Sequence, residues 1–350
     1  MGQDLRTPLC RELGIEYPIF NAGVGTAAGP ELAAAVSNAG GFGVLGASAY
    51  LPDAIRDLVA RTRKLTNRPF GLNIIIAEDE APSASDDDRA VLHQQISAAI
   101  EERVAVLVLF WGNPAPYVKQ AHDNGVKLMI QVGSVDEARA AAAAGVDAVI
   151  AQGVEAGGHV RGTTSIWTLI PAIVESIKPV PVLASGGIGD GAGLARALQL
   201  GAQGVSLGTR FVASNEANVH AAYQQRIVKA TAADTVLNYV YDIWWPDAPS
   251  RTIRNKTIAE WEAAGRPPSG QRPGEGTSIG KRRNAQGQVM EWPRYAIGVA
   301  TPDFDGDIEY APLSAGESCS VVNDVKPAAE IVADLVRNAQ AALLAATPMR

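Results

Sequence analysis

The chain has 350 residues, a formal net charge of −7 and 47% apolar residues. This length suits two average domains or one α/β barrel with insertions, and the apolar share is ample for a large core. The acidic balance contains no basic block, which argues against binding to nucleic acid or to anionic membrane surfaces. We therefore expect a small molecule as the partner.

Cysteine usage and the N-terminal residues narrow the setting further. Cys10 and Cys319 are the only cysteines, and neither belongs to a Cys/His cluster, which argues against a disulfide framework and a metal site. The N-terminus lacks the apolar core of a signal peptide, and no apolar run approaches the roughly 20 residues that span a bilayer. We expect a cytoplasmic protein.

Predicted strands and helices alternate along the first two thirds of the chain. Short β-branched or apolar runs predict eight strands. These are 18–23, 41–46, 70–76, 104–110, 127–132, 148–153, 181–187 and 204–211. Segments that begin with Pro, Ser or Asp and end with Gly predict helices between them. The clearest helices are 29–40, 51–65, 134–145 and 189–201.

Eight βα units that close on themselves predict a (β/α)8 barrel, the TIM barrel, over residues 1–230. A barrel places its chemistry on the loops that follow the strands. A doubly wound open sheet is the alternative, and it would place a ligand at a switch point instead.

The pattern changes after residue 230. Residues 240–320 are rich in Pro, Gly and charge and show no clean period, whereas 326–346 return to an amphipathic helical pattern. We expect residues 231–325 to form an irregular, partly helical insertion near the barrel mouth. Residues 326–350 are expected to pack back on the barrel as a helix.

Three tryptophans of the insertion are expected to supply apolar cover at the barrel mouth. They are Trp244, Trp245 and Trp292. A flexible surface loop is the alternative for residues 265–290 alone.

Two glycine-rich turns follow the seventh and eighth predicted strands, at 184–193 and 206–211. Glycine lets backbone N–H groups approach an anion, and a helix start adds a favourable dipole. The last two loops of a barrel are the usual place for a ligand phosphate. The residues concerned are Ser185, Gly186, Gly187, Gly208 and Thr209.

Amide side chains at other strand ends indicate that the ligand carrying this phosphate is a flavin. Asn73, Gln131 and Gln152 are placed to hydrogen-bond an isoalloxazine ring, although an internal polar layer of the barrel is the alternative. No GxGxxG fingerprint opens a βαβ unit, so a dinucleotide domain is not expected. Pyridoxal phosphate needs a Schiff-base lysine, and Lys127 stands at the wrong end of its strand. These observations favour FMN.

Six motifs, in chain order, resemble the nitronate monooxygenase family, formerly called 2-nitropropane dioxygenases. They are PIFNAGVG, GGFGVLGA, FGLNIII, GVDAVIAQGVEAGGH, VPVLASGGIGDG and GVSLGTRF, within residues 8–230. The resemblance implies an FMN-containing (β/α)8 barrel with His159 as the active-site histidine. It also implies FMN contacts from Asn73, Gln152, Gly157, Gly187, Gly208 and Thr209, and a flavin-facing first loop of Ala22, Gly23 and Val24.

Relatives of this family share the fold and the histidine turn but reduce enoyl thioesters or quinones with NAD(P)H. They commonly carry lysine late in the fifth strand, where this chain has Gln131, and this difference argues against that activity. His93, His122 and His220 lie in predicted helices and are expected to be surface or packing residues. Arg251 and Arg254 are expected either to cover the site or to pair with acids elsewhere.

His159 is the one histidine on a predicted barrel loop, and imidazole is the side chain best poised to take a proton near pH 7. The expected reaction is FMN-dependent oxidation of alkyl nitronates or nitroalkanes with O2 to carbonyl compounds and nitrite. The alternatives are an NAD(P)H-dependent FMN reductase of quinones or enoyl thioesters and a non-catalytic barrel that binds flavin or phosphate. A homodimer is left open as the assembly.

Overall fold

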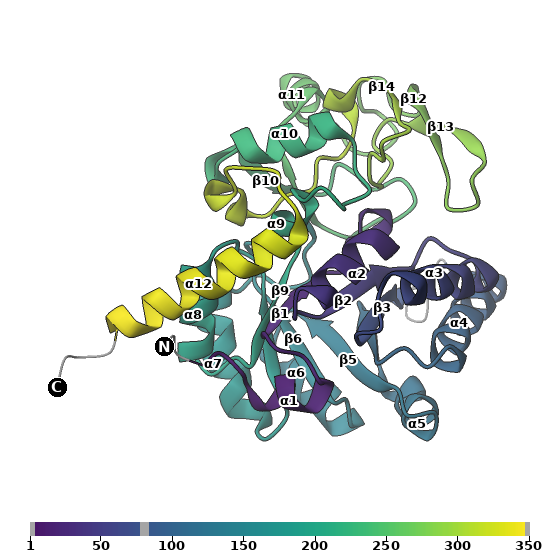
Figure 1. The fold of residues 1–350 in the computed structure, drawn as a ribbon. Coiled ribbons are helices and arrows are strands. Elements are labelled where there is room, and N and C mark those ends of the chain that lie inside the picture. Colours follow the sequence, from purple (N-terminus) through teal and green to yellow (C-terminus); the bar gives the residue numbers. More distant parts are fainter. Residues whose placement is uncertain (1–3, 78–83, 347–350) are drawn as a thin grey trace.

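A ring of eight parallel strands forms the centre of the molecule in the computed structural model, which describes residues 4–77 and 84–346 (Figure 1). The strands are β1 (Ile19–Asn21), β2 (Gly43–Gly46), β3 (Phe70–Ile75), β4 (Val106–Phe110), β5 (Lys127–Val132), β6 (Ala148–Gln152), β8 (Val182–Ser185) and β9 (Gly204–Leu207). A parallel bridge between Phe20 and Phe42 joins β1 to β2 and closes the ring. The predicted TIM barrel is confirmed, and the open-sheet alternative is wrong.

Helices cover the outside of this ring. They are α2 (Pro30–Asn38), α3 (Pro52–Leu65), α4 (Asp86–Glu101), α5 (Ala115–Asp123), α6 (Val135–Ala144), α7 (Ile166–Ile177), α8 (Gly191–Gln199) and α12 (Ala328–Ala346). Helix α12 packs against α8 and α2 and therefore takes the place of the eighth barrel helix (Figure 1). The predicted strand 204–211 is shorter than expected, because the chain turns at Gly208 and continues as the short helix α9 (Thr209–Val212).

The N-terminal end of the barrel is plugged by the short helix α1 (Pro8–Leu13). Leu9, Cys10 and Leu13 are buried in one cluster with barrel-interior residues such as Phe20 and Val106. Burial of apolar side chains at this end stabilises the barrel and leaves the opposite end, where the strands terminate, available for a ligand.

The long segment between α9 and α12 contains the predicted insertion, residues 231–325, and the helix that precedes it. Its elements are α10 (Ala221–Lys229), η3 (Ala232–Asp234), β10 (Thr235–Asn238), β11 (Ser250–Ile253), α11 (Lys256–Ala263), β12 (Ser278–Arg283), β13 (Val289–Pro293), β14 (Asp305–Gly306), η4 (Ile308–Tyr310) and η5 (Glu317–Val321). It packs on the barrel as a separate layer (Figure 1). Strand β12 lies within 265–290, so this region is not the uniform loop of the alternative interpretation.

Two antiparallel sheets organise the insertion, and one of them includes a barrel loop. Strands β12, β13 and β14 form the first sheet, and β10 and β11 form the second together with β7 (Gly158–His159) from the loop after β6. Ser250 and His159 are direct partners in this pairing. The insertion therefore fixes the backbone of the predicted active-site histidine. Within 4–77 and 84–346 no helix is long and apolar enough to cross a membrane.

Candidate active site

A cavity of about 480 Å³ lies at the carboxyl ends of the barrel strands. This volume lies in the range of about 300–1,000 Å³ that small-molecule and cofactor sites occupy. All the residues predicted from the sequence to bind the cofactor or to act in catalysis line it, although they come from six different barrel loops or strands. They are Ala22, Gly23, Val24, Asn73, Gln131, Gln152, Gly157, His159, Ser185, Gly186, Gly187, Gly208 and Thr209.

Glycines form one wall of this cavity. Gly186 and Gly187 have φ angles of +94° and +70°, which L side chains rarely adopt, and a Cβ at either would lie 3.0 Å from the loop of Ala156 and Glu155. Their N–H groups have no acceptor within the described part of the chain. Thr209 Oγ1 accepts a 2.9 Å hydrogen bond from the Gly316 N–H, so its own hydroxyl hydrogen is left for a ligand. These donors suit an anion.

Gln152 is used differently from the expectation. Its Nε2 donates to the His159 carbonyl at 2.8 Å, and its Oε1 accepts from the Arg161 N–H at 2.9 Å. Both ends of the amide therefore hold the loop that carries His159. Asn73 Nδ2 donates to the Val108 carbonyl at 3.0 Å, which leaves its oxygen for a ligand.

Aromatic rings surround His159. The Trp245 ring centroid lies 3.8 Å from that of the imidazole, and the Trp111 centroid lies 5.2 Å from Trp245 and 6.1 Å from His159. The Arg161 guanidinium lies 4.9 Å from the Trp111 centroid on the same cluster. These apolar surfaces restrict the rotamers of the histidine and exclude water from it.

The charge state of His159 follows from this environment. Burial lowers its pKa from the ordinary 6.5 to about 4, and the neighbouring backbone of Ala248 and Pro249 opposes this only in part. Neither ring nitrogen has a partner in hydrogen-bond geometry among the described residues. At pH 7 the imidazole is therefore neutral, and one nitrogen offers a lone pair.

Two charged residues fix the loop between β6 and His159. Arg251 donates to the Val154 carbonyl at 2.9 Å and forms an ion pair with Glu317 at 3.3 Å. Glu155 accepts from the Ile166 N–H at 3.0 Å, at the start of α7. Of the two expectations for Arg251, the structure supports pairing with an acid and not contact with the cavity.

The structure adds lining residues that the sequence did not identify. Tyr223 comes from α10, and Arg282 and Asn284 come from the insertion, where no repeated pattern signals them. Trp111 is not a lining residue but directly follows β4 and belongs to the ring cluster around His159, and the rule that residues after barrel strands lie near the site would have found it. Trp244 and Trp245 line the cavity as expected. Trp292 does not, because it is fully buried in the insertion's own core.

The other histidines lie away from this cavity. His122 pairs with Asp147 at 2.9 Å, and His220 Nδ1 accepts from the Ala222 N–H at the start of α10. His93 packs near Tyr117, with ring centroids 5.9 Å apart. No cluster of three or more potential metal ligands occurs in the described ranges.

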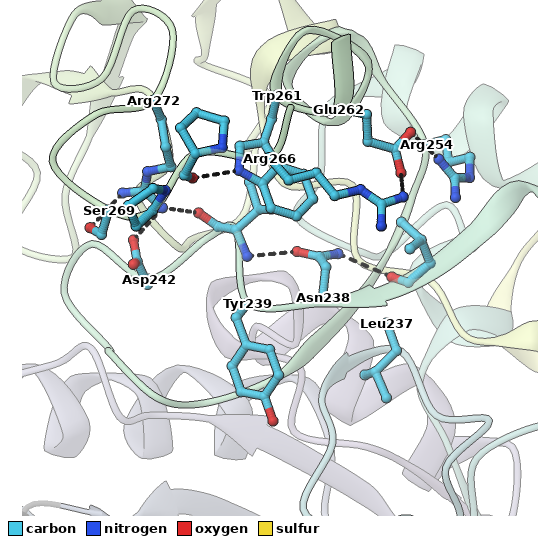
Figure 2. A pocket seen from close by; sticks show the side chains of 14 residues that line it. Leu237, Asn238, Tyr239, Asp242, Arg254, Trp261, Glu262, Arg266, Ser269 and Arg272 are labelled. Atoms are coloured by element: carbon cyan, nitrogen blue, oxygen red, sulfur yellow. Dashed lines mark hydrogen bonds and ion pairs between the residues drawn. The ribbon is translucent and has the colours of Figure 1, made fainter. Parts of the chain in front are cut away.

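A second cavity, of about 450 Å³, lies within the insertion between β10 and α11 (Figure 2). Its cations are all paired: Arg254 and Arg266 both contact Glu262, at 2.7 and 3.1 Å. Arg272, whose side chain is 2% exposed, contacts Asp242 at 2.7 Å and also Glu275. Figure 2 shows these side chains directed at one another rather than into a common space. This cavity presents few free polar groups to a ligand.

The barrel cavity fits a flavin on three observations. The glycine wall leaves room that a Cβ would fill and presents free N–H groups to a phosphate. The Asn73 and Gln131 amides line the interior, where a polar ring system would meet them. His159, whose buried ring nitrogens have no hydrogen-bond partner among the described residues, lines a cavity large enough for a further substrate.

Comparison with known proteins finds a matching family model, sequence relatives and similar solved structures. A family model described as nitronate monooxygenase matches residues 6–338. A "(3aS,4S,5R,7aS)-5-hydroxy-7a-methyl-1-oxo-octahydro-1H-indene-4-carboxyl-CoA dehydrogenase" of Mycobacterium tuberculosis is 30% identical over 96% of both chains. A probable nitronate monooxygenase of Staphylococcus aureus is 32% identical over 72% of this chain and 79% of the relative. The solved structure of FabK from Thermotoga maritima is 33% identical, with a TM-score of 0.78 over 97% of this chain and 98% of that one.

Proposed function

The chain belongs to the nitronate monooxygenase family of flavin-dependent oxidoreductases, and from this premise we propose that it binds FMN and oxidises alkyl nitronates or nitroalkanes with O2. The products are a carbonyl compound and nitrite. The observation that carries the proposal is the neutral, unpartnered imidazole of His159 in a cavity with an anion cradle.

FMN is proposed over FAD because the cavity offers one compact phosphate cradle. The backbone N–H groups of Gly186 and Gly187 and the hydroxyl of Thr209 hold the phosphate, with Ser185 and Gly208 beside them. Asn73 and Gln131 contact the ring system, and the loop of Ala22 to Val24 and Gly157 bound the same space. When bound, the flavin supplies the electron acceptor for the nitronate and passes the electrons to O2.

His159 takes the proton in this proposal. A nitroalkane loses the proton on the carbon beside its nitro group, and a ring nitrogen of neutral His159 accepts it, which leaves a nitronate anion. The lowered pKa keeps the nitrogen free at pH 7. Trp245 and Trp111 hold the ring and exclude water, and Gln152 fixes the backbone on both sides of it.

One experiment tests the proposed function. The purified protein is mixed anaerobically with propyl-2-nitronate, NADH or NADPH while the visible absorption of the flavin is followed, and the released cofactor is identified by mass. We expect FMN, and bleaching by the nitronate but not by the nicotinamides. Rapid bleaching by NAD(P)H alone, or a colourless protein that FMN does not reconstitute, contradicts the proposal.

A second candidate is an oxidoreductase of an acyl thioester. The observation that favours it is coverage: the carboxyl-CoA dehydrogenase of M. tuberculosis aligns with 96% of this chain, whereas the probable nitronate monooxygenase of S. aureus aligns with 72%. Rapid bleaching by NAD(P)H or by an acyl-CoA in the same experiment would support this candidate.

A further inference from the structure

The wall of the barrel cavity carries a guanidinium without a counter-charge. Arg282, from β12 of the insertion, lines the cavity. Its only hydrogen bond within the described residues runs from one terminal nitrogen to the Val299 carbonyl at 3.2 Å, and its buried Nε has no partner. Across 4–77 and 84–346 no carboxylate lies within ion-pair distance of it.

Aromatic rings hold this side chain in place. Its guanidinium carbon lies 4.2 Å from the Trp292 ring centroid and 5.9 Å from that of Trp244. Gly298 allows the close approach, because a Cβ there would lie 2.8 Å from an Arg282 terminal nitrogen. Removing a cation partly from water costs free energy, and an unpaired cation does not recover this cost unless an anion binds to it.

The nearest acid does not serve as that anion. Asp303 accepts from the Thr301 hydroxyl at 2.6 Å and from the Arg283 N–H at 2.7 Å. Burial lowers the pKa of Arg282, and the charge of Asp303 opposes this only in part. The arginines of the second cavity differ, since Arg254, Arg266 and Arg272 all have carboxylate partners.

The position of Arg282 separates it from the glycine wall. It packs against Gly298 and Val299, and a Cβ at Gly25 of the first barrel loop would meet Val299 at 3.7 Å. Gly186 and Gly187 instead face Ala156 and Glu155 on another loop. The first barrel loop also borders the proposed phosphate cradle, since a Cβ at Gly208 would lie 3.4 Å from Val24, but no Arg282 atom lies within 4 Å of that position.

Two adjacent tryptophans lie between Arg282 and the histidine. The Trp245 ring packs against His159 with the two ring planes tilted by 47°, and Trp244, its chain neighbour, lies beside Arg282 and is 53% exposed. An aromatic surface therefore separates the cation from the base, and the exposure of Trp244 places the cation toward the cavity mouth.

We propose that Arg282 binds a carboxylate or phosphate oxyanion of the substrate at the cavity mouth. The preferred substrate is then an elongated anion whose charged group lies apart from the carbon that reacts beside His159. The planar guanidinium fork matches either oxyanion, and the tryptophans cover the apolar part between the two ends. This inference rests on the proposed function only for the identity of the reacting group.

The test compares matched anionic and neutral ligands on the flavin-loaded protein. Binding is measured by perturbation of the flavin absorption, without turnover, for 4-nitrobutanoate against 1-nitrobutane and for coenzyme A against pantetheine. The first pair reports a carboxylate and the second a phosphate. The variants are Arg282→Gln and Arg282→Lys, the second of which preserves the charge. The control is Lys281→Gln on the same strand, which removes a positive charge that is paired with Glu291.

We expect Arg282→Gln to weaken one anionic ligand by about tenfold or more, the scale of a charged hydrogen bond, and its neutral partner by less than about twofold. Arg282→Lys should recover part of the loss, and Lys281→Gln should change neither ligand. Equal weakening of both members of a pair, or no anionic preference in the unmodified protein, overturns the inference.

Loss of flavin affinity in Arg282→Gln and in Arg282→Lys also overturns it, because the guanidinium then belongs to the cofactor. The proposed function can fail separately. A protein that never oxidises a nitronate but loses anion binding in Arg282→Gln retains this inference.

Discussion

The two cavities have similar volumes, about 480 and 450 Å³, but they differ in whether their arginines are paired with carboxylates. In the insertion cavity, Arg254 and Arg266 share Glu262, and Arg272 is held by Asp242. In the barrel cavity, both nitrogens of His159 and the Nε of Arg282 lack partners among the described residues. The Arg272 Nε and one Asp242 oxygen of the insertion cavity also lack hydrogen-bond partners, so the difference between the cavities lies in ion pairing: each cation of the insertion cavity has a carboxylate partner, and Arg282 has none among the described residues.

The largest expected effect is the loss of the unpartnered histidine. His159→Asn should lower kcat/KM for neutral nitroalkanes by roughly 10²- to 10⁴-fold, because a general base contributes on that scale. Preformed nitronates, which need no deprotonation, should be affected much less. Oxygen consumption measures both, and flavin content should remain unchanged. His122→Ala, which removes a histidine paired with Asp147, is the control, and equal losses for both substrates would remove His159 from its role as base.

The next largest effect concerns the insertion cavity and is measured as a change in the free energy of unfolding. Arg272→Met should lower the free energy of unfolding by about 3–5 kcal/mol, because it leaves Asp242 and Glu275 without their buried partner. Arg254→Met removes a cation that is 46% exposed and should cost less than about 1 kcal/mol. Urea denaturation gives both values. A small loss in Arg272→Met would show that its ion pairs contribute little to folding.

The pH dependence of stability should separate the two cavities. The pKa of His159 falls from 6.5 to about 4 in the folded protein, so the unfolded chain binds more protons between these values. Stability is then complete above pH 6.5 and falls by about 3 kcal/mol as pH drops to 4. Side-chain contact with Arg272 lowers the pKa of Glu275 from 4.5 to about 2, so its contribution is present above pH 4.5 and is lost below it.

These windows can be measured on the flavin-free protein by denaturation at a series of pH values. His159→Asn should remove the loss between pH 6.5 and 4 only, and Glu275→Gln should change the slope below pH 4.5 only. A His159→Asn profile parallel to that of the unmodified protein would mean that the imidazole is not held neutral by burial.

The smallest effect tests the glycine wall. Gly187→Ala places a Cβ at φ +70° and 3.0 Å from the Glu155 Cβ, which should cost about 1–2 kcal/mol and weaken flavin binding about tenfold. Gly265→Ala has a similar φ of +82° but nothing within 4 Å, so it should lose stability without losing flavin affinity. Flavin titration followed by fluorescence makes the comparison. Unchanged affinity in Gly187→Ala would remove this glycine from the phosphate cradle.

The barrel was predictable from the sequence because the same strand–helix unit repeats along the chain. Residues such as Asn73 and Gln131 were found by one rule, that side chains near the ends of parallel strands meet at one mouth, and the structure places them on one cavity. Their individual contacts with a flavin stay a prediction. Gln152 shows the limit of the rule, because both ends of its amide hold the histidine loop.

The insertion was not predictable in the same way. It lacks a period, so nothing in the sequence indicated that Trp292 would enter a core of its own or that Arg282 would reach the barrel cavity. Pairing of Ser250 and Arg251 with Gly158–His159 joins segments about 90 residues apart, and a two-residue strand carries no local signal. The domain boundaries at 230 and 325 likewise stay a prediction.

The position of α12 has a consequence for synthesis on the ribosome. This helix covers α8 and α2, yet it follows the whole insertion along the chain. Until the insertion has been made, the nascent barrel lacks its eighth helix, and the faces of α8 and α2 that pack against α12, such as the one around Gly191, are less protected than in the finished fold. The insertion is thus synthesised before the last helix of the barrel on which it packs.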